Sequence, residues 1–388
     1  MRASSGPTPP LIVVGSGLAA YTLVREWRKA DTETPLVLIT ADDGAGYSKP
    51  MLSNAHSKGQ SADDLIQMSA TEVAERYQAE VLTRTEVLHI DPTTRTLHLD
   101  SGEALVWGQL VLAVGAEPIR APLEGNALNR VFSVNDRLDF ARLQAELEGA
   151  RQVTIMGGGL IGSEFANDLI SAGFEVDLVA PSETLLTGLV PAEVGDALRQ
   201  ALADAGVRFH LGPLVSRVDR TEAGKFQVSL TNGQKIPTDL VLSAVGLSPR
   251  LDLARKAGLK VNRGIMVNKY LQTSDPSIYA LGDCAEVEGL VLMYVMPLMN
   301  AARALAKTLT GEKTAVQWPA MPVTVKTPLC PVIAYPSRGT GAWQIDGSGA
   351  NLAAVCRQGE SIVGFALSGE RIKERNIWLK AVPPLLAS

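Results

Sequence analysis

The sequence predicts an α/β protein in which one strand–turn–helix unit occurs twice, and three observations support this prediction. Two glycine-rich turns, within residues 15–20 and 157–162, each follow an apolar run and precede an apolar helix. Two later apolar strands, within 109–115 and 239–246, each run into a glycine. Such strands are typical of a buried parallel sheet with helices on both faces. The repeated order indicates an internal duplication.

Both glycine-rich turns have the spacing of a dinucleotide site. The first glycine permits a tight turn, and the second leaves room for a pyrophosphate. The third small residue, Ala20 or Gly162, lets helix and strand pack closely, and phosphates then meet the free N–H groups of the helix N-terminus. Either turn alone could be a plain βα turn, but together they predict two bound dinucleotides. The residues expected there are Gly15, Ser16, Gly17, Leu18 and Ala19, then Gly157, Gly159, Leu160, Ile161, Gly162 and, after the closing strand, Gly246.

The elements between these landmarks repeat in the same order. The expected elements are helices over 18–29 and 160–172, strands over 36–40 and 176–179, and hairpins over 87–99 and 216–230. The apolar stretch 289–305 predicts a buried helix beneath a cofactor, because Pro297, Asn300 and Arg303 interrupt it as a membrane span. From about Trp318 the chain changes to short β-rich runs punctuated by proline and glycine.

The composition is that of an ordinary globular protein, with 46% hydrophobic and 20% charged residues among 388. This length suits two or three domains, and a net charge of −5 gives no reason to expect nucleic acid as a partner. Three widely spaced cysteines form neither a disulfide framework nor a metal site, so we expect a reducing, cytoplasmic setting. Residues 1–10 are expected to be a disordered lead rather than a signal peptide.

The two turns, the two closing strands and the segment 279–285 together resemble the pyridine-nucleotide flavoprotein reductases of the glutathione-reductase fold. The resemblance covers essentially the whole chain and implies FAD in the first turn and NAD in the second. It implies two Rossmann-like domains, with the NAD-binding domain (117–246) inserted in a discontinuous FAD-binding domain (1–116 and 247–317). A small α+β C-terminal domain (318–388) follows.

A closer resemblance, in residues 47–53 and 321–328, is to the rubredoxin–NAD(+) reductases of this family. It implies NADH as donor and rubredoxin or a rubredoxin-like domain as acceptor, upstream of a process such as alkane hydroxylation or oxidative or nitrosative stress defence. We expect a monomer or homodimer. Dithiol reductases of the family need a cysteine pair beside the flavin, and neither Cys-x-x-Cys nor Cys-x4-Cys occurs here. Thiol-dependent peroxidases of the family carry one cysteine where this chain has Asn54, so we interpret Cys284, Cys330 and Cys356 as packing residues.

The resemblance assigns further FAD contacts one by one. An acid after the second strand takes the adenosine ribose, and we prefer Asp42 to Asp43 because Ala41 occupies the commonest acidic place. Val87 falls where the family's backbone contacts the adenine. Asp283, expected at a strand-to-helix junction, accepts from the ribityl hydroxyls. Val295 lies in the helix expected beneath the cofactor.

Three charged residues are the candidate catalytic groups. Lys49 precedes a proline as the family's flavin-side lysine does, and Glu164 resembles the glutamate that pairs with it near flavin N5. In such a buried pair, each charge compensates the other, and removal of one would leave an uncompensated buried charge. Lys326 stands where ferredoxin-type relatives have a tryptophan-rich segment, and a cation there would stabilise reduced flavin at N1 and O2. The alternative for Lys49 and Lys326 is a surface lysine.

The NAD half departs from the usual pattern. The second strand normally ends with an acid that bonds both ribose hydroxyls, but this chain has Ala180 there. The segment 180–183 also offers no cation for a 2′-phosphate, so we expect NADH rather than NADPH, with Glu183 as a substitute contact. Three functions stay open: an electron-transfer reductase of rubredoxin or ferredoxin type, a small-molecule reductase acting on oxygen, quinone or thiol, and a flavin-binding structural or regulatory protein.

Overall fold

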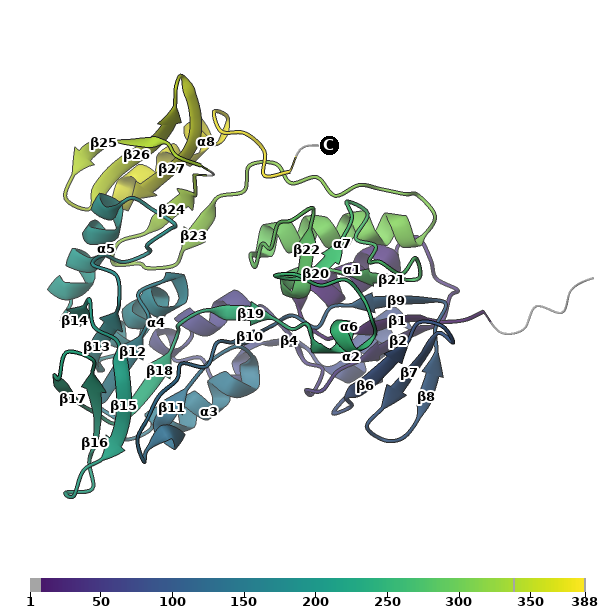
Figure 1. The fold of residues 1–388 in the computed structure, drawn as a ribbon, viewed down its shortest axis with the longest axis horizontal. Helices are drawn as coiled ribbons and strands as arrows, with labels where there is room; N and C mark the ends of the chain where they lie inside the picture. Colours follow the sequence, from purple (N-terminus) through teal and green to yellow (C-terminus); the bar gives the residue numbers. More distant parts are fainter. Residues whose placement is uncertain (1–7, 338, 387–388) are drawn as a thin grey trace, which may run out of the picture.

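The structure, a computed structural model, describes residues 8–337 and 339–386 and is built around three five-stranded sheets (Figure 1). The expected disordered lead falls largely on residues 1–7, which lie outside the described residues. Two of the sheets are parallel and belong to the repeated units. The third is antiparallel and belongs to the C-terminal region.

The first sheet has the strand order β21-β9-β1-β2-β5 and is parallel throughout. Its strands are β1 (Leu11–Val14), β2 (Leu36–Ile39), β5 (Ala79–Leu82), β9 (Gln109–Leu112) and β21 (Ile278–Ala280). Helices α1 (Leu18–Trp27) and α7 (Val295–Leu309) pack together on it. Because β21 joins this sheet only after the second sheet is complete, the predicted insertion of one domain in the other is confirmed.

The second sheet repeats this arrangement with the order β11-β18-β12-β13-β14, again parallel. Its strands are β11 (Val131–Phe132), β12 (Gln152–Met156), β13 (Glu175–Ala180), β14 (Arg208–Leu211) and β18 (Leu240–Ser243). Its helices are α3 (Arg137–Leu147), α4 (Leu160–Ser171) and α5 (Ala192–Asp204). The strands are buried because their valines, leucines and isoleucines face helices or the hairpin sheet.

Both expected hairpins are confirmed, and each gains a third strand. They are β6 (Val87–Asp91), β7 (Thr96–Leu99) and β8 (Ala104–Val106), then β15 (Val215–Arg220), β16 (Phe226–Leu230) and β17 (Lys235–Thr238). Short pairs link the domains and loops: β3 (Gly46–Tyr47) with β4 (Ile66–Met68), β10 (Ala116–Pro118) with β19 (Leu247–Pro249), and β20 (Ile265–Val267) with β22 (Ala285–Val287). The remaining helices of these domains are α2 (Ala70–Tyr77) and α6 (Asp252–Lys256), with short 3-10 turns between.

The C-terminal region is an antiparallel sheet of order β23-β24-β27-β26-β25 beside the second domain (Figure 1). Its elements are β23 (Val323–Val325), β24 (Val332–Tyr335), β25 (Ala342–Ser348), β26 (Asn351–Gln358), β27 (Ser361–Ser368) and α8 (Arg375–Leu379). The α+β prediction for this region is confirmed. Within residues 8–337 and 339–386, no helix has the length and apolar character needed to cross a membrane.

Two local expectations are corrected. The helix expected within 289–305 begins only at Val295, since residues 289–294 are not helical. The strand ending at Ala280 leads into a single 3-10 turn, Gly282–Cys284, and not into an α-helix. Asp283 is therefore held at a sharp turn, while the helix beneath the cavity begins later.

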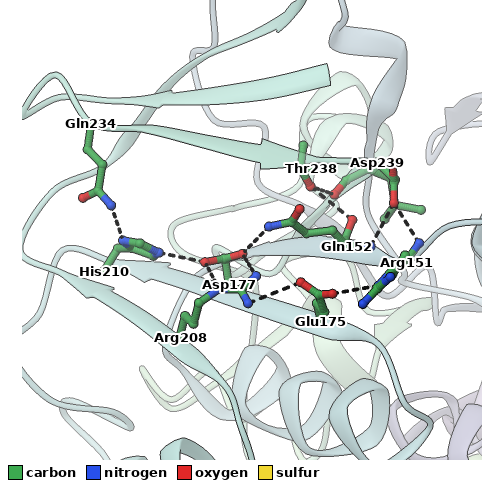
Figure 2. A network of polar contacts seen from close by, with 10 residues as sticks. Arg151, Gln152, Glu175, Asp177, Arg208, His210, Gln234, Thr238 and Asp239 are labelled. Atoms are coloured by element: carbon green, nitrogen blue, oxygen red, sulfur yellow. Dashed lines mark hydrogen bonds and ion pairs between the residues drawn. The ribbon is translucent and has the colours of Figure 1, made fainter. Parts of the chain in front are cut away.

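A polar network ties together the amino ends of the second sheet's strands, away from the glycine turn (Figure 2). The carboxylate of Asp177 on β13 is almost fully buried and accepts from Arg208 Nη2 at 2.7 Å and Gln152 Nε2 at 3.1 Å. His210 Nε2 lies 2.9 Å from it. Burial alone would raise the pKa of Asp177, but hydrogen bonds from Arg208, His210 and Gln152 together hold it below its ordinary value.

Candidate functional site

A cavity of about 1500 Å³ is lined by both parallel-sheet domains and by the C-terminal domain. The first glycine turn contributes residues 16–19, the second 157–161, and the C-terminal domain 321–324 together with Lys326. In parallel α/β folds ligands bind at the carboxyl ends of the strands, where both turns lie. The cavity is larger than the roughly 300–1,000 Å³ of ordinary small-molecule sites, in keeping with two dinucleotides.

The first turn has the shape that a pyrophosphate needs. Gly15 has φ +120°, and a Cβ there would lie 2.2 Å from the carbonyl oxygen of Ala113, so only glycine fits between β1 and β9. A Cβ at Gly17 would meet nothing within 4 Å, so the space beside the α1 N-terminus is open. Gly17 is the N-cap of α1 and no side chain caps it, which leaves the first N–H groups available for phosphate oxygens.

The second turn repeats this geometry. Gly157 has φ +109°, and its Cβ would lie 2.5 Å from the carbonyl oxygen of Ala244, the residue after β18. A Cβ at Gly162 would lie 2.0 Å from the Gly157 oxygen, which explains the small residue in third place. Gly159, the uncapped N-cap of α4, is open on the cavity side. The donor set of both turns therefore fits dinucleotides.

The structure separates the two acids after β2. Asp42 Oδ1 accepts from Ser16 Oγ at 2.9 Å and from Gly44 N at 2.8 Å, so its carboxylate lies beside the first turn. Asp43 instead pairs with the buried Arg137 at the start of α3. Although Asp42 does not itself line the cavity, its place beside Ser16 supports the choice of Asp42 over Asp43.

The expected pairing of Lys49 with Glu164 is wrong. Lys49 Nζ donates to Asn135 Oδ1 at 2.7 Å and lies 3.8 Å from Asp283 Oδ2. Burial lowers the pKa of Lys49, which Asp283 opposes, and burial raises the pKa of Asp283, which Lys49 opposes. Lys49 and Asp283 both line the cavity. Within residues 8–337 and 339–386, Lys49 is the charged partner of the half-buried Asp283 carboxylate, which faces the cavity.

Glu164 pairs with Lys326 instead, because the C-terminal domain brings Lys326 against α4. Glu164 is fully buried, and its Oε2 accepts from Lys326 Nζ in an ion pair and from Ser53 Oγ at 2.5 Å. Its Oε1 accepts from the Lys326 backbone N at 2.8 Å. Lys326 is 29% exposed and lines the cavity, so it is not a surface lysine.

The same face of α4 holds two further segments through polar side chains. Asn167 Oδ1 accepts from Leu329 N at 3.1 Å, and Asp168 accepts from His56 N at 3.1 Å and Ser57 N at 3.0 Å. Asn167 and Asp168 are buried, and buried side chains of this kind need such partners. Sequence reasoning missed both, although their spacing from Glu164 by three and four positions places all three on one helix face.

The cavity lining contains a cation that sequence reasoning missed. Ala180 and Ser182 line the cavity, whereas Glu183 is not part of its lining. Arg217 of β15 also lines it, with Nη1 2.6 Å from Glu124 Oε2 and Nε 3.1 Å from Asp219 Oδ2. The guanidinium is therefore already paired on two sides. Its position on a remote hairpin gave no signal in the fingerprint segment.

The other predicted contacts divide into two groups. Val295 and Gly246 line the cavity, as the resemblance implies. Val87, at the start of β6, does not, so its contact with adenine stays a prediction.

The three cysteines are buried, and burial raises the pKa of the Cys284 thiol to about 11, which supports their interpretation as packing residues.

The two glycine turns face one cavity, which residues of the C-terminal domain also line. This arrangement defines a two-nucleotide α/β oxidoreductase. The chain belongs to the pyridine nucleotide-disulphide oxidoreductase family, whose model matches residues 9–306, and residues 315–382 match the rubredoxin binding C-terminal domain. The sequence-based resemblance is therefore confirmed.

The relatives agree with this assignment. The chain is 48% identical over 380 residues to a rubredoxin-NAD(+) reductase of Alcanivorax borkumensis, covering 97% of this chain and 99% of the relative. It is 38% identical over 385 residues to a nitric oxide reductase FlRd-NAD(+) reductase of Aeromonas hydrophila, covering 98% of each. Among solved structures, a ferredoxin reductase from Rhodopseudomonas palustris has a TM-score of 0.88 at 26% identity, over 97% of this chain and 96% of that one. Putidaredoxin reductase in its covalent complex with putidaredoxin, at 24% identity over 97% and 94% and a TM-score of 0.88, shares the fold.

Proposed function

We propose that the protein catalyses the reduction of rubredoxin, or of a rubredoxin-like domain, by NADH through FAD. The observation that carries this proposal is the shared cavity, which both glycine turns and Lys326 of the matched rubredoxin binding region line. FAD, when bound, supplies the capacity to accept a hydride and to release electrons singly.

The FAD and NAD sites are proposed from the cavity and from the family resemblance. The FAD site consists of Gly15, Ser16, Gly17, Leu18, Ala19, Asp42, Lys49, Val87, Glu164, Asp283, Val295 and Lys326. The NAD site consists of Gly157, Gly159, Leu160, Ile161, Gly162 and Gly246, with Ser182 preferred to Glu183 at the ribose. The domain boundaries after residues 116, 246 and 317 stay part of this proposal.

Within these sites, each group has a physical task. The N–H groups of the two turns bind the pyrophosphates, and the carboxylate of Asp283 accepts from the ribityl chain. Lys326 places positive charge where negative charge develops when the flavin is reduced, and Glu164 fixes the position of Lys326. Lys49 keeps Asp283 in place at the cavity wall through its charge.

The test is a two-step kinetic measurement on the purified holoprotein. Stopped-flow mixing with NADH should bleach the flavin absorbance within the turnover time, and steady-state turnover with rubredoxin should far exceed turnover with quinones or oxygen. A flavin that NADH fails to bleach would identify a structural or regulatory flavoprotein. Equal turnover with quinone and rubredoxin would identify a small-molecule reductase.

A further inference from the structure

Ser53 is a buried hydroxyl that contacts both members of the Glu164–Lys326 ion pair. It lies in the 3-10 turn Lys49–Asn54 and is 3% exposed. Its Oγ donates to Glu164 Oε2 at 2.5 Å and accepts from Lys326 Nζ at 3.0 Å. Because the hydroxyl proton is directed at Glu164, a lone pair of the same oxygen faces the ammonium.

These contacts fix the direction of the ammonium. A lysine head has three N–H donors, and here one goes to Glu164 and one to Ser53. The two acceptors determine where the third N–H points. Lys326 also lines the cavity, so the head is held by the protein on one side and borders the cofactor space on the other.

The neighbouring residue holds the backbone of the same lysine. Asn54 Nδ2 donates to the Lys326 carbonyl oxygen at 3.3 Å, while the Lys326 backbone N donates to Glu164. Backbone N–H, backbone C=O and side-chain head of Lys326 are therefore each bonded to Ser53, Asn54 or Glu164. Asn54 occupies the place where thiol-dependent relatives carry cysteine.

We propose that Ser53 and Asn54 form a clamp, here called the 53–54 clamp, that positions the Lys326 ammonium toward the bound flavin. Both are positioning residues, since they act through Lys326 and not on the reacting atoms. The proposal rests on the proposed function, because it requires FAD in the cavity. It explains why a buried serine contacts the side-chain head of Lys326 while the neighbouring asparagine contacts its backbone carbonyl.

The experiment is a double-mutant cycle between Ser53→Ala and Lys326→Met, with flavin reduction potential as the readout. The potential is measured by dye equilibration with a chemical reductant, so that it is independent of NADH. Ser53→Ala should lower the potential in the Lys326 background and slow flavin reduction by NADH about two- to tenfold, as expected for one lost hydrogen bond. In the Lys326→Met background the same substitution should change neither value, because the lysine through which it acts is absent.

The matched control is Ser163→Ala, which removes another buried serine hydroxyl, on α4, that has no hydrogen-bond partner within the described residues. This variant should keep the wild-type potential. An unchanged potential in Ser53→Ala, or an equal shift with and without Lys326, would overturn the clamp. If Ser53→Ala fails to fold, Asn54→Ala enters the same cycle with the same expected pattern. A wild-type flavin that NADH does not bleach would instead count against the proposed function, while the potentials would still test the clamp.

Discussion

Lys326 of the C-terminal domain and Glu164 of helix α4 form a buried ion pair that joins the acceptor side of the protein to the nucleotide side. The lysine contributes both its ammonium and its backbone N–H to the carboxylate. Breaking this pair would leave Glu164 as an uncompensated charge with no access to water, which is costly. The pair therefore joins the C-terminal domain to the second parallel-sheet domain at the cavity.

The first prediction concerns the charge of Lys326. At an effective dielectric of about 20, a charge ~4 Å away is worth roughly 4 kcal/mol before screening, so we expect a net effect of about 1–2 kcal/mol on reduced flavin. Since about 30 mV corresponds to ~1.4 kcal/mol for a two-electron couple, Lys326→Met should lower the flavin potential by roughly 20–45 mV. Dye equilibration measures this shift. A potential equal to that of the wild type would show that Lys326 does not act on the flavin.

The second prediction is that no protein thiol takes part in electron transfer. Cys284, Cys330 and Cys356 are buried, and burial raises the pKa of the Cys284 and Cys330 thiols, so the reactive thiolate is disfavoured. Replacement of all three by alanine should keep NADH-to-rubredoxin turnover within a few-fold, with some loss of thermal stability from the lost packing. Loss of turnover in a variant that still folds and binds FAD would contradict this.

The third prediction concerns the choice of nucleotide. Arg217 lines the cavity but is paired with Glu124 and Asp219, so we expect a higher kcat/KM for NADH than for NADPH. Glu124→Gln removes one partner and should raise kcat/KM for NADPH several-fold while changing that for NADH little. The ratio of the two values, measured at one pH, is the test. The control is Glu222→Gln, which removes a charge outside the cavity lining from the β15–β16 hairpin that carries Arg217, and it should leave the ratio unchanged. An unchanged ratio in Glu124→Gln would place Arg217 away from the 2′-position.

The fourth prediction concerns acid stability. The pKa of Asp177 lies below its ordinary value in the folded protein, so its stabilising contribution is present above about pH 4, the unfolded pKa, and is lost as the pH falls through the folded pKa. Asp177→Asn should reduce the free energy of unfolding at pH 7 by about 1–3 kcal/mol, and this difference should shrink toward pH 3. Urea unfolding at both pH values measures it. Glu175→Gln, in the exposed part of the network, should cost less than about 1 kcal/mol. A deficit in Asp177→Asn that stays constant with pH would mean that the carboxylate charge is not the cause.

How far the sequence predicts this protein depends on how local each feature is. The two turns follow from a spacing of a few residues, because Gly15 and Gly157 each occupy a conformation that other residues avoid. The pairing of Glu164 is different, since its partner Lys326 lies 162 positions later and arrives with another domain. The sequence therefore predicts that Lys49, Glu164 and Lys326 lie at the cofactor cavity. Tertiary packing decides that Glu164 pairs with Lys326 and not with Lys49.

Besides the Lys326 ion pair, helix α4 binds the C-terminal domain through backbone groups, and this has a consequence for how acceptor preference can change. Glu164 and Asn167 accept from the main-chain N–H groups of residues 326 and 329, which every amino acid except proline supplies. Side chains on the outer surface of residues 315–382 can therefore change to suit a different iron protein, while the backbone contacts with α4 are kept. In chimaeras that exchange this region between relatives, the region should keep its position against α4. Evolution can likewise change the electron acceptor without changing the nucleotide sites.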